Sequence, residues 1–303
     1  MNTQQESINT RKVAVFLLIT FILAIVIGSI PPLLKLKWQG STATIIGIIY
    51  MLFPALTAVF VQKVLCHEPV IKPLRVSFKL NRWFLLAWIL PVILGLATIP
   101  VETLFPGVIY TPDMSGMLER YQDMMTAEQL AEMERSIQQL PVHPLFLTIV
   151  QGMIAGITVN ALAAFGEELG WRGFLLQEFK ALGFLRSSLY IGIIWGVWHA
   201  PLILQGHNYP EHPVAGVFLM ILFCLLLTPL LNYVTLKAQS VIAAAVMHGT
   251  LNGTAGMAIM MIKGGSDLTM GLTGAAGLII LLAANLILYL ATGRYRNIQY
   301  AED

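Results

Sequence analysis

Charge is scarce in this chain. Only 11% of its 303 residues are Asp, Glu, Lys or Arg, whereas 57% are hydrophobic. Soluble domains carry about 25% charged residues, so this composition excludes a soluble core and predicts a polytopic membrane protein. The formal net charge of +2 gives no reason to expect an acidic partner, and we expect no nucleic-acid binding.

Cysteines, internal repeats and several peptidase motifs are also scarce or missing. The two cysteines, Cys66 and Cys224, lie far apart in the sequence, so no disulfide framework is expected. The sequence contains no repeat of about 20–50 residues. It lacks the Gly-x-Ser-x-Gly elbow of serine hydrolases, the Gly-x-Gly-Asp string of intramembrane aspartyl proteases and the His-Glu-x-x-His of zinc peptidases.

Long apolar runs dominate the chain instead. A membrane span needs about 20 mostly apolar residues, and on this criterion we predict an all-α, polytopic membrane helix bundle with about eight transmembrane helices. The predicted spans are roughly 13–30, 41–65, 83–105, 145–165, 187–206, 213–236, 240–262 and 272–293. The first follows Arg11 and Lys12 and has no clear cleavage site, so we expect a retained span rather than a signal peptide.

Lysine and arginine predict the orientation of the bundle. With a cytoplasmic N-terminus, the outer segments carry only Lys35, Lys37, Arg120, Arg135 and Lys263 of the 18 lysines and arginines. Both termini are therefore predicted to be cytoplasmic, as an even number of spans requires. The small extramembrane content and the lack of sorting signals favour a bacterial plasma (inner) membrane, where the chain would contact lipid.

One long segment, about residues 106–144, lies outside the predicted spans. It is acidic, and its methionine and leucine residues recur at helical spacing. Thr126 followed by Gln129 matches a capping box that would open a second short helix. We interpret the segment as an amphipathic hairpin on the outer membrane surface, with a Met-rich lid as the alternative. Residues 1–144 would then form an N-terminal unit of three spans plus this segment.

Three charged side chains, Glu167, Glu168 and Arg172, stand together at the inner end of the fourth predicted span, where the chain is expected to be in the bilayer. Each ionisable group near the bilayer centre costs about 2.5–3.5 kcal/mol on insertion scales, so such groups persist where they pair or perform chemistry. Glu168 and Arg172 are four residues apart on one helix face, which predicts an ion pair. Glu167 points elsewhere and is expected to be an unpaired carboxylate suited to a general base. Asn160 lies on the same face as Glu167 and is a candidate partner for it.

Two further strings place histidine inside predicted spans. Trp195 and His199 are four residues apart, so the indole is expected to pack against the imidazole. His248 and Asn252 have the same spacing and lie beside a ridge of small residues that would let another helix approach closely. The ridge consists of Ala245, Gly249 and Gly253. A lone intramembrane histidine is often a hydrogen-bonding strut, but two with nearby carboxylates favour chemistry. The other four histidines fall in predicted loops and are expected to be solvated.

The three strings together carry a family resemblance. Glu-Glu-x-x-x-Arg at 167–172, Trp-x-x-x-His at 195–199 and His-x-x-x-Asn at 248–252 follow one another on successive spans. In this order they resemble the CPBP family, the intramembrane CAAX-protease and bacteriocin-processing proteins, also called Abi proteins. The resemblance covers roughly residues 145–262. Trp195 is a departure, because the family more often has phenylalanine there.

The resemblance implies an all-helical bundle with a cavity between the motif helices that opens to the cytoplasmic side. It implies hydrolysis of a peptide bond in a membrane-anchored protein or peptide, with residues 145–303 as the catalytic unit. Glu167 with His199 would activate a water, and His248 with Asn252 would stabilise the oxyanion. The supporting residues would be Glu168, Arg172 and Trp195. Glu167 would then have His199, His248 and Asn252 as its partners.

Metal dependence stays open at this point. The family is often described as metalloproteases, and Glu167, His199 and His248 could bind zinc with an open fourth position. The same groups suffice for a metal-free, glutamate-activated water, which is the mechanism we expect.

Two other functions also stay open. A non-catalytic scaffold or bacteriocin-immunity protein of the same fold would keep the motif residues as a structural hydrogen-bond network. A proton-coupled transporter would use intramembrane Glu and His as a relay, although no internal repeat in hydropathy supports it. The sequence does not name the substrate or show that a prenyl group is recognised.

Overall fold

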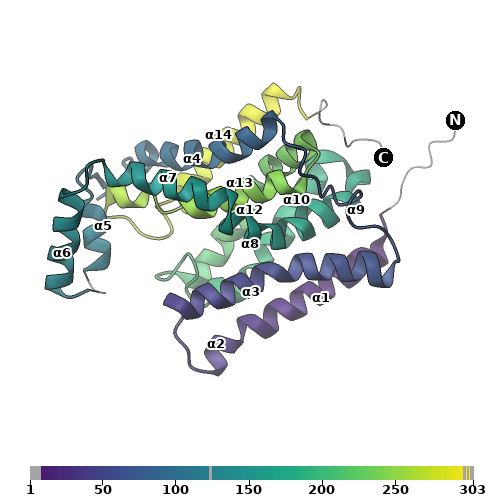
Figure 1. Cartoon of the computed structure of the whole chain (residues 1–303), viewed down its shortest axis with the longest axis horizontal. Coiled ribbons are helices and arrows are strands. Elements are labelled where there is room, and N and C mark those ends of the chain that lie inside the picture. The colour runs from purple at the N-terminus through teal and green to yellow at the C-terminus, as the bar shows by residue number, and fades with distance from the viewer. Residues whose placement is uncertain (1–7, 123–124, 296–297, 299, 301–303) are drawn as a thin grey trace.

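The computed structural model describes residues 8–122, 125–295, 298 and 300, and it confirms the predicted helical membrane bundle (Figure 1). Residues 123–124 of the predicted outer segment lie outside this described part. The helices are α1 (Thr10–Gly28), α2 (Ile30–Leu33), α3 (Gly40–Val59), α4 (Arg82–Glu102), α5 (Ser115–Tyr121), α6 (Ala127–Gln138), α7 (Pro144–Ile157), α8 (Val159–Glu168), α9 (Leu176–Glu178), α10 (Gly183–Trp198), α11 (Ala200–Ile203), α12 (Pro213–Ala238), α13 (Val241–Thr254) and α14 (Ala275–Ala291). The π-helical turns are η1 (Phe60–Leu65) and η2 (Leu169–Leu175), the 3₁₀ turns are η3 (Lys180–Leu182) and η4 (Ile259–Met261), and the two short strands are β1 (Ile109–Tyr110) and β2 (Ile262–Lys263).

The described residues contain five helices long and apolar enough to cross a membrane, or six if the bent pair α7–α8 is one span. These five helices are Thr10–Leu33, Gly40–Leu65, Arg82–Glu102, Lys180–Ile203 and Pro213–Ala238. Large apolar side chains on their surfaces, such as Leu18 and Ile25, are more than half exposed. Lipid covers such a surface without the free-energy cost that water would impose. The chain is an integral membrane protein.

Helices occur at all the predicted span positions, but the predicted number of eight spans is not confirmed. Helices α13 and α14 have 14 and 17 residues, whereas a full span needs about 20. The fourth predicted span is longer than expected. It bends by 52° between Ile157 and Val159 and continues to Glu178. Glu167 therefore lies well inside this segment and not at its inner end.

The first residues of α1 and the last residues of α14 lie at one end of the bundle, to the right in Figure 1. At this end, Lys12 Nζ lies 2.6 Å from both Glu68 Oε2 and Glu178 Oε1. The Ser240 hydroxyl donates to the Ser77 carbonyl at 2.5 Å. These contacts gather the start of α1 and the connections α3–α4, α9–α10 and α12–α13. We call this the termini end.

The remaining connections meet at the opposite end, which we call the loop end. The rings of Trp38 and His207 are 5.6 Å apart between centroids, which joins the α2–α3 and α11–α12 connections. Asp267 Oδ2 accepts from the backbone nitrogens of Glu211 and His212 at 2.7 and 3.2 Å. This pair of bonds joins the α11–α12 connection to the α13–α14 connection. Alternate connections thus lie on opposite faces, as expected of a membrane bundle.

The segment predicted to be an amphipathic hairpin forms α5 and α6 at the loop end, to the left in Figure 1. Thr126 and Gln129 make both hydrogen bonds of the predicted capping box. No residue of α6, all of which is described, is buried. Strand β1 pairs antiparallel with β2, which ties this segment to the α13–α14 connection.

One hydrophobic core runs through the described bundle. The ring of Phe16 in α1 stacks on Phe174 at 4.5 Å and meets Trp171 edge-on at 5.8 Å. The Tyr50 hydroxyl of α3 donates to the Trp198 carbonyl at 2.5 Å. These contacts join the first spans to the motif-bearing helices. The division after residue 144 stays a prediction.

Candidate active site

The string Glu167–Arg172 lies where a regular helix becomes wider. Glu167 and Glu168 end α8, and Arg172 lies in the π-helical turn η2. All three side chains are buried, and Glu167 is the most exposed of them at only 2%. π-Helical turns are rare and are frequent at functional sites. The widened turn still places Arg172 against Glu168.

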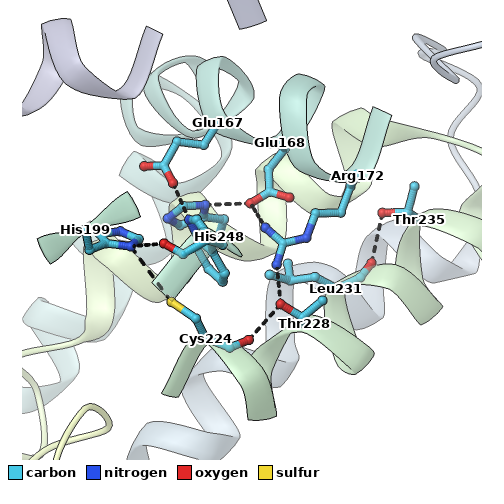
Figure 2. A network of polar contacts seen from close by, with 10 residues as sticks. Glu167, Glu168, Arg172, His199, Cys224, Thr228, Leu231, Thr235 and His248 are labelled. Carbon is cyan, nitrogen blue, oxygen red and sulfur yellow. Dashed lines mark hydrogen bonds and ion pairs between the residues drawn. The ribbon is translucent and has the colours of Figure 1, made fainter. Parts of the chain in front are cut away.

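The predicted ion pair is present. Arg172 Nη1 lies 3.1 Å from Glu168 Oε1, as Figure 2 shows. Arg172 Nη2 donates to Thr228 Oγ1 of α12 at 3.0 Å, and the guanidinium carbon lies 4.2 Å from the Trp195 ring centroid. A buried ion pair persists only where further contacts satisfy its polar atoms. The sequence analysis missed Thr228, because a threonine in an apolar run carries no motif.

The His248 side chain contacts Glu168, whereas the resemblance predicted Glu167 as its partner. Its Nδ1 lies 2.7 Å from Glu168 Oε1 (Figure 2). Glu168 makes this contact because, one residue further around the helix, it occupies the face that α13 crosses; His248 as a partner of Glu167 stays a prediction. A carboxylate accepts hydrogen bonds, so Nδ1 donates and Nε2 is left to the space beyond the ring. We call Glu168, Arg172, Thr228 and His248 the buried polar network.

Glu167 has a partner that the sequence analysis did not predict. Its Oε2 accepts a hydrogen bond from Trp195 Nε1 at 2.6 Å. The sequence analysis missed this hydrogen bond because it considered the Trp195 side chain only as a packing surface; no ion pair of Glu167 is seen among the described residues. Phenylalanine has no such donor, so the departure from the family pattern creates this contact. The predicted packing of Trp195 on His199 is also present, with ring centroids 5.5 Å apart.

His199 directly follows α10, and its ring orientation is fixed. Its Nδ1 lies 2.8 Å from the carbonyl oxygen of Trp195. A carbonyl oxygen only accepts, so Nδ1 carries the proton and Nε2 of the neutral ring is the acceptor. The two intramembrane histidines therefore differ in what accepts their Nδ1–H: a carboxylate for His248 and a backbone carbonyl for His199.

Glycines bring α13 close to the helix that carries the two glutamates. A Cβ added to Gly249 would lie 2.6 Å from the backbone nitrogen of Ala161. Only a residue without a side chain fits, as the predicted ridge of small residues requires. Asn160 Nδ2 donates to the Gly249 carbonyl at 3.3 Å. Asn160 therefore joins α8 to α13, and its predicted contact with Glu167 is wrong.

A cavity of about 480 Å³ lies between the motif helices. Its lining includes Glu167, Trp195, His199, His248 and Asn252. The structure thus brings the four predicted catalytic side chains to one space, while Glu168 and Arg172 lie behind it. Much of the remaining lining is apolar and comes from α3 and α12, helices that carry no motif. It includes Tyr50, Met51, Met220, Phe223 and Leu227.

The cavity lies in the half of the bundle nearest the loop end. His207 and Asn208 of the α11–α12 connection line it, as does Thr273 of the α13–α14 connection. His207 is only partly exposed, so the expectation of a solvated side chain is wrong for this residue. The cavity cannot open to the cytoplasm if the termini are also cytoplasmic, because the loops that line the cavity lie at the end of the bundle opposite the termini.

The three residues considered as zinc ligands do not fit a zinc site in this arrangement. Among the described residues, the one group of three His, Cys, Asp or Glu side chains whose ligand atoms lie within 4.8 Å of one another is elsewhere. That group is Glu211, His212 and Asp267. Each of Glu167, His199 and His248 keeps a second ligand atom beyond the one that another protein group engages, but the ligand atoms of the three do not all lie within 4.8 Å of one another. We derive no step through a metal ion.

Comparison with known proteins finds a likeness in the segment that carries the motifs. Residues 144–254 match the family model described as Type II CAAX prenyl endopeptidase Rce1-like. These residues are similar to that family, and we call them the Rce1-like segment. It contains every site residue predicted from the three strings, and it confirms the resemblance to the CAAX-protease family. The match does not extend to the first three spans.

A curated protein shows a similar local likeness. CAAX prenyl protease 2 of Methanococcus maripaludis is 32% identical over 97 residues, which is 30% of this chain. The chain covers 36% of that protein's length. The likeness to the relative therefore concerns a part of each protein.

Proposed function

We propose that this chain is an intramembrane endopeptidase of the CAAX-protease type, which hydrolyses a peptide bond in a membrane-anchored protein or peptide. One observation carries the proposal: four polar side chains from three helices line one cavity inside the Rce1-like segment. These side chains are Glu167, His199, His248 and Asn252. We further propose a bacterial plasma membrane as the location of the protein.

Glu167 and His199 would activate the attacking water. The carboxylate of Glu167 is held at Oε2 by the indole of Trp195, which fixes its orientation toward the cavity. Neutral His199 presents Nε2 as a second acceptor, because Nδ1 is bonded to the backbone. A positioned general base contributes about 10²–10⁴-fold to a rate.

His248 and Asn252 would stabilise the oxyanion of the tetrahedral intermediate. A protonated His248 can donate from Nε2 into the cavity while Nδ1 donates to Glu168. The exposed Asn252 adds an amide donor from the next turn of α13. Donors fixed before the reaction stabilise developing charge without reorganisation. Glu168 and Arg172 would keep His248 in place and hold the α8 end against α12 and α13.

The test compares wild type with Glu167→Gln in intact cells and in detergent. Peptides that appear only with wild type identify substrates, and the purified proteins are then assayed on them. We expect Glu167→Gln to lower kcat by about 10²-fold or more, with unchanged thermal unfolding. Glu211→Gln is the matched control, because Glu211 is an exposed carboxylate that does not line the cavity.

Equal cleavage by wild type and Glu167→Gln would refute the proposal. A biological phenotype that survives Glu167→Gln but not Arg172→Met would favour the scaffold or immunity function instead. Substrate flux in proteoliposomes that is lost in Glu167→Gln would favour the transporter.

A further inference from the structure

We propose that the cavity opens on the extracytoplasmic face of the membrane, so that its substrate is an apolar, membrane-anchored peptide presented outside the cytoplasm. That the occupant is a substrate rests on the proposed function. The side of the opening rests on separate observations.

The first observation is the depth of the cavity along the bundle. From α12 it takes Met220 and Phe223, in the half nearer the loop end, and Leu227 just past the middle of that helix. From α3 it takes Gly47, in the half that begins at the loop end, and Tyr50 and Met51 at the middle. These helices run in the same direction between the membrane faces, because both begin at the loop end. Their lining residues therefore place the cavity at one depth, from the middle of the bundle toward that end.

The second observation is the rim around the cavity. Asn208, which lines the cavity, is exposed, and so is Asn252 one turn beyond His248. Asp267 holds the surrounding loops in place, because its Oδ1 lies 2.7 Å from His212 Nδ1 and its Oδ2 accepts two backbone N–H groups. The contact of Trp38 with His207 joins a third connection to this rim. The connections at the loop end therefore form an ordered rim around the mouth of the cavity.

The third observation is the distribution of positive charge. The connections at the loop end carry only Lys35, Lys37, Arg120, Arg135 and Lys263 of the 18 lysines and arginines in the chain. The termini end holds most of the others. Lysine and arginine accumulate on the cytoplasmic side of short connections, so the termini end is cytoplasmic and the loop end is extracytoplasmic.

The cavity lining describes the chemistry of the occupant. Polar groups come from α8, α10 and α13, whereas α3 and α12 supply the aromatic, methionine and leucine side chains. A peptide bond placed against the polar groups would have apolar side chains next to it. An anchored peptide in the outer leaflet presents such residues at the depth of the cavity.

Thiol labelling in intact cells tests the side directly. The background is Cys66→Ser, which leaves the buried Cys224 as the remaining thiol. Into it we introduce either Asn208→Cys at the mouth or Lys79→Cys, an exposed position at the termini end. The reagent is a membrane-impermeant maleimide. We expect Asn208→Cys to react in intact cells and Lys79→Cys to react only after permeabilisation. The reverse order, or labelling of neither or both variants before permeabilisation, would overturn the inference.

The peptides released in cells test the substrate class. Fragments that depend on Glu167 should derive from extracytoplasmic segments and be found outside the cytoplasm. Fragments from cytoplasmic tails would overturn the inference while leaving the proposed peptidase in place. If detergent-solubilised wild type does not cleave the substrates identified in cells, the proposed function fails. The labelling result still decides which face of the membrane the cavity meets.

Discussion

Two neighbouring carboxylates show two ways in which a membrane protein holds charge. Glu168 belongs to the buried polar network, where Arg172 and His248 both contact its Oε1. Glu167 has one indole donor and borders the cavity. Burial of an ion requires partners, and Glu168 has two of them in Arg172 and His248. Pairing therefore accounts for the burial of Glu168, whereas Glu167, at the wall of the cavity, is available to act on a substrate.

Removing the cation from the buried polar network should have the largest effect. Arg172→Met leaves Glu168 buried without its main partner, and such a loss costs about 3–5 kcal/mol of stability. Thermal unfolding of the purified protein measures it. The control is Arg135→Met, because Arg135 and its partner Glu132 are 66% and 70% exposed, and exposed pairs contribute about 0–1 kcal/mol. Equal melting of the two variants would contradict the structural role of the network.

The comparison of two asparagines separates the cavity from the packing. Asn252 is exposed to the cavity, so Asn252→Ala should lower kcat by about 10²–10³-fold, the effect of losing one oxyanion donor, and leave stability unchanged. Asn285 is buried, and its Nδ2 donates to the carbonyls of Leu226 and Leu281, both at 2.7 Å. Asn285→Ala should therefore lower the melting temperature and spare kcat. Kinetics and unfolding of both variants check this, and identical profiles would remove the distinction.

Two neighbouring tryptophans test the contact that holds Glu167. Trp195 Nε1 donates to Glu167, whereas Trp198 Nε1 is buried without a hydrogen-bond partner among the described residues. Trp195→Phe keeps the ring and removes the donor. We expect kcat to fall about tenfold, which corresponds to about 1.4 kcal/mol, with KM unchanged because substrate contacts are kept.

Trp198→Phe provides the matched control, since it makes the same change at an equally buried ring that donates to nothing. Its kcat should equal that of wild type. A loss of kcat that is the same in both variants would show that ring packing, and not the hydrogen bond, sets the activity.

The sequence analysis correctly predicted two contacts between residues four apart. The pairing of Glu168 with Arg172 and the packing of Trp195 on His199 each join residues four apart on one helix, so their spacing is sufficient. The capping box of Thr126 follows from the same kind of local pattern. Hydropathy located the helices for the same reason, because each apolar run is a property of one segment.

The contacts that the sequence analysis did not predict all join different helices. His248 reaches Glu168, the Trp195 indole reaches Glu167, and Asn160 reaches Gly249. These depend on how α8, α10 and α13 cross, which hydropathy does not determine. The end of the bundle nearest the cavity was not predictable from the motifs for a similar reason. The motifs lie inside helices, but the depth of the site follows from loops that carry no motif, such as the one with His207 and Asn208.

The rim of the cavity should respond to acid in a way that a solvated loop would not. Burial lowers the pKa of His207 to about 4, from an ordinary value of 6.5. Between these two pKa values His207 is neutral in the folded state and protonated in the unfolded chain. Stability is therefore lost as pH falls from about 6.5 to about 4. Between pH 7 and pH 5 the loss attributable to His207 should be about 1–2 kcal/mol. His207→Gln has no such group, so its unfolding temperature should fall less than that of wild type over this range. An equal fall in both proteins would show that His207 is solvated after all, and that the mouth of the cavity is looser than its contacts indicate.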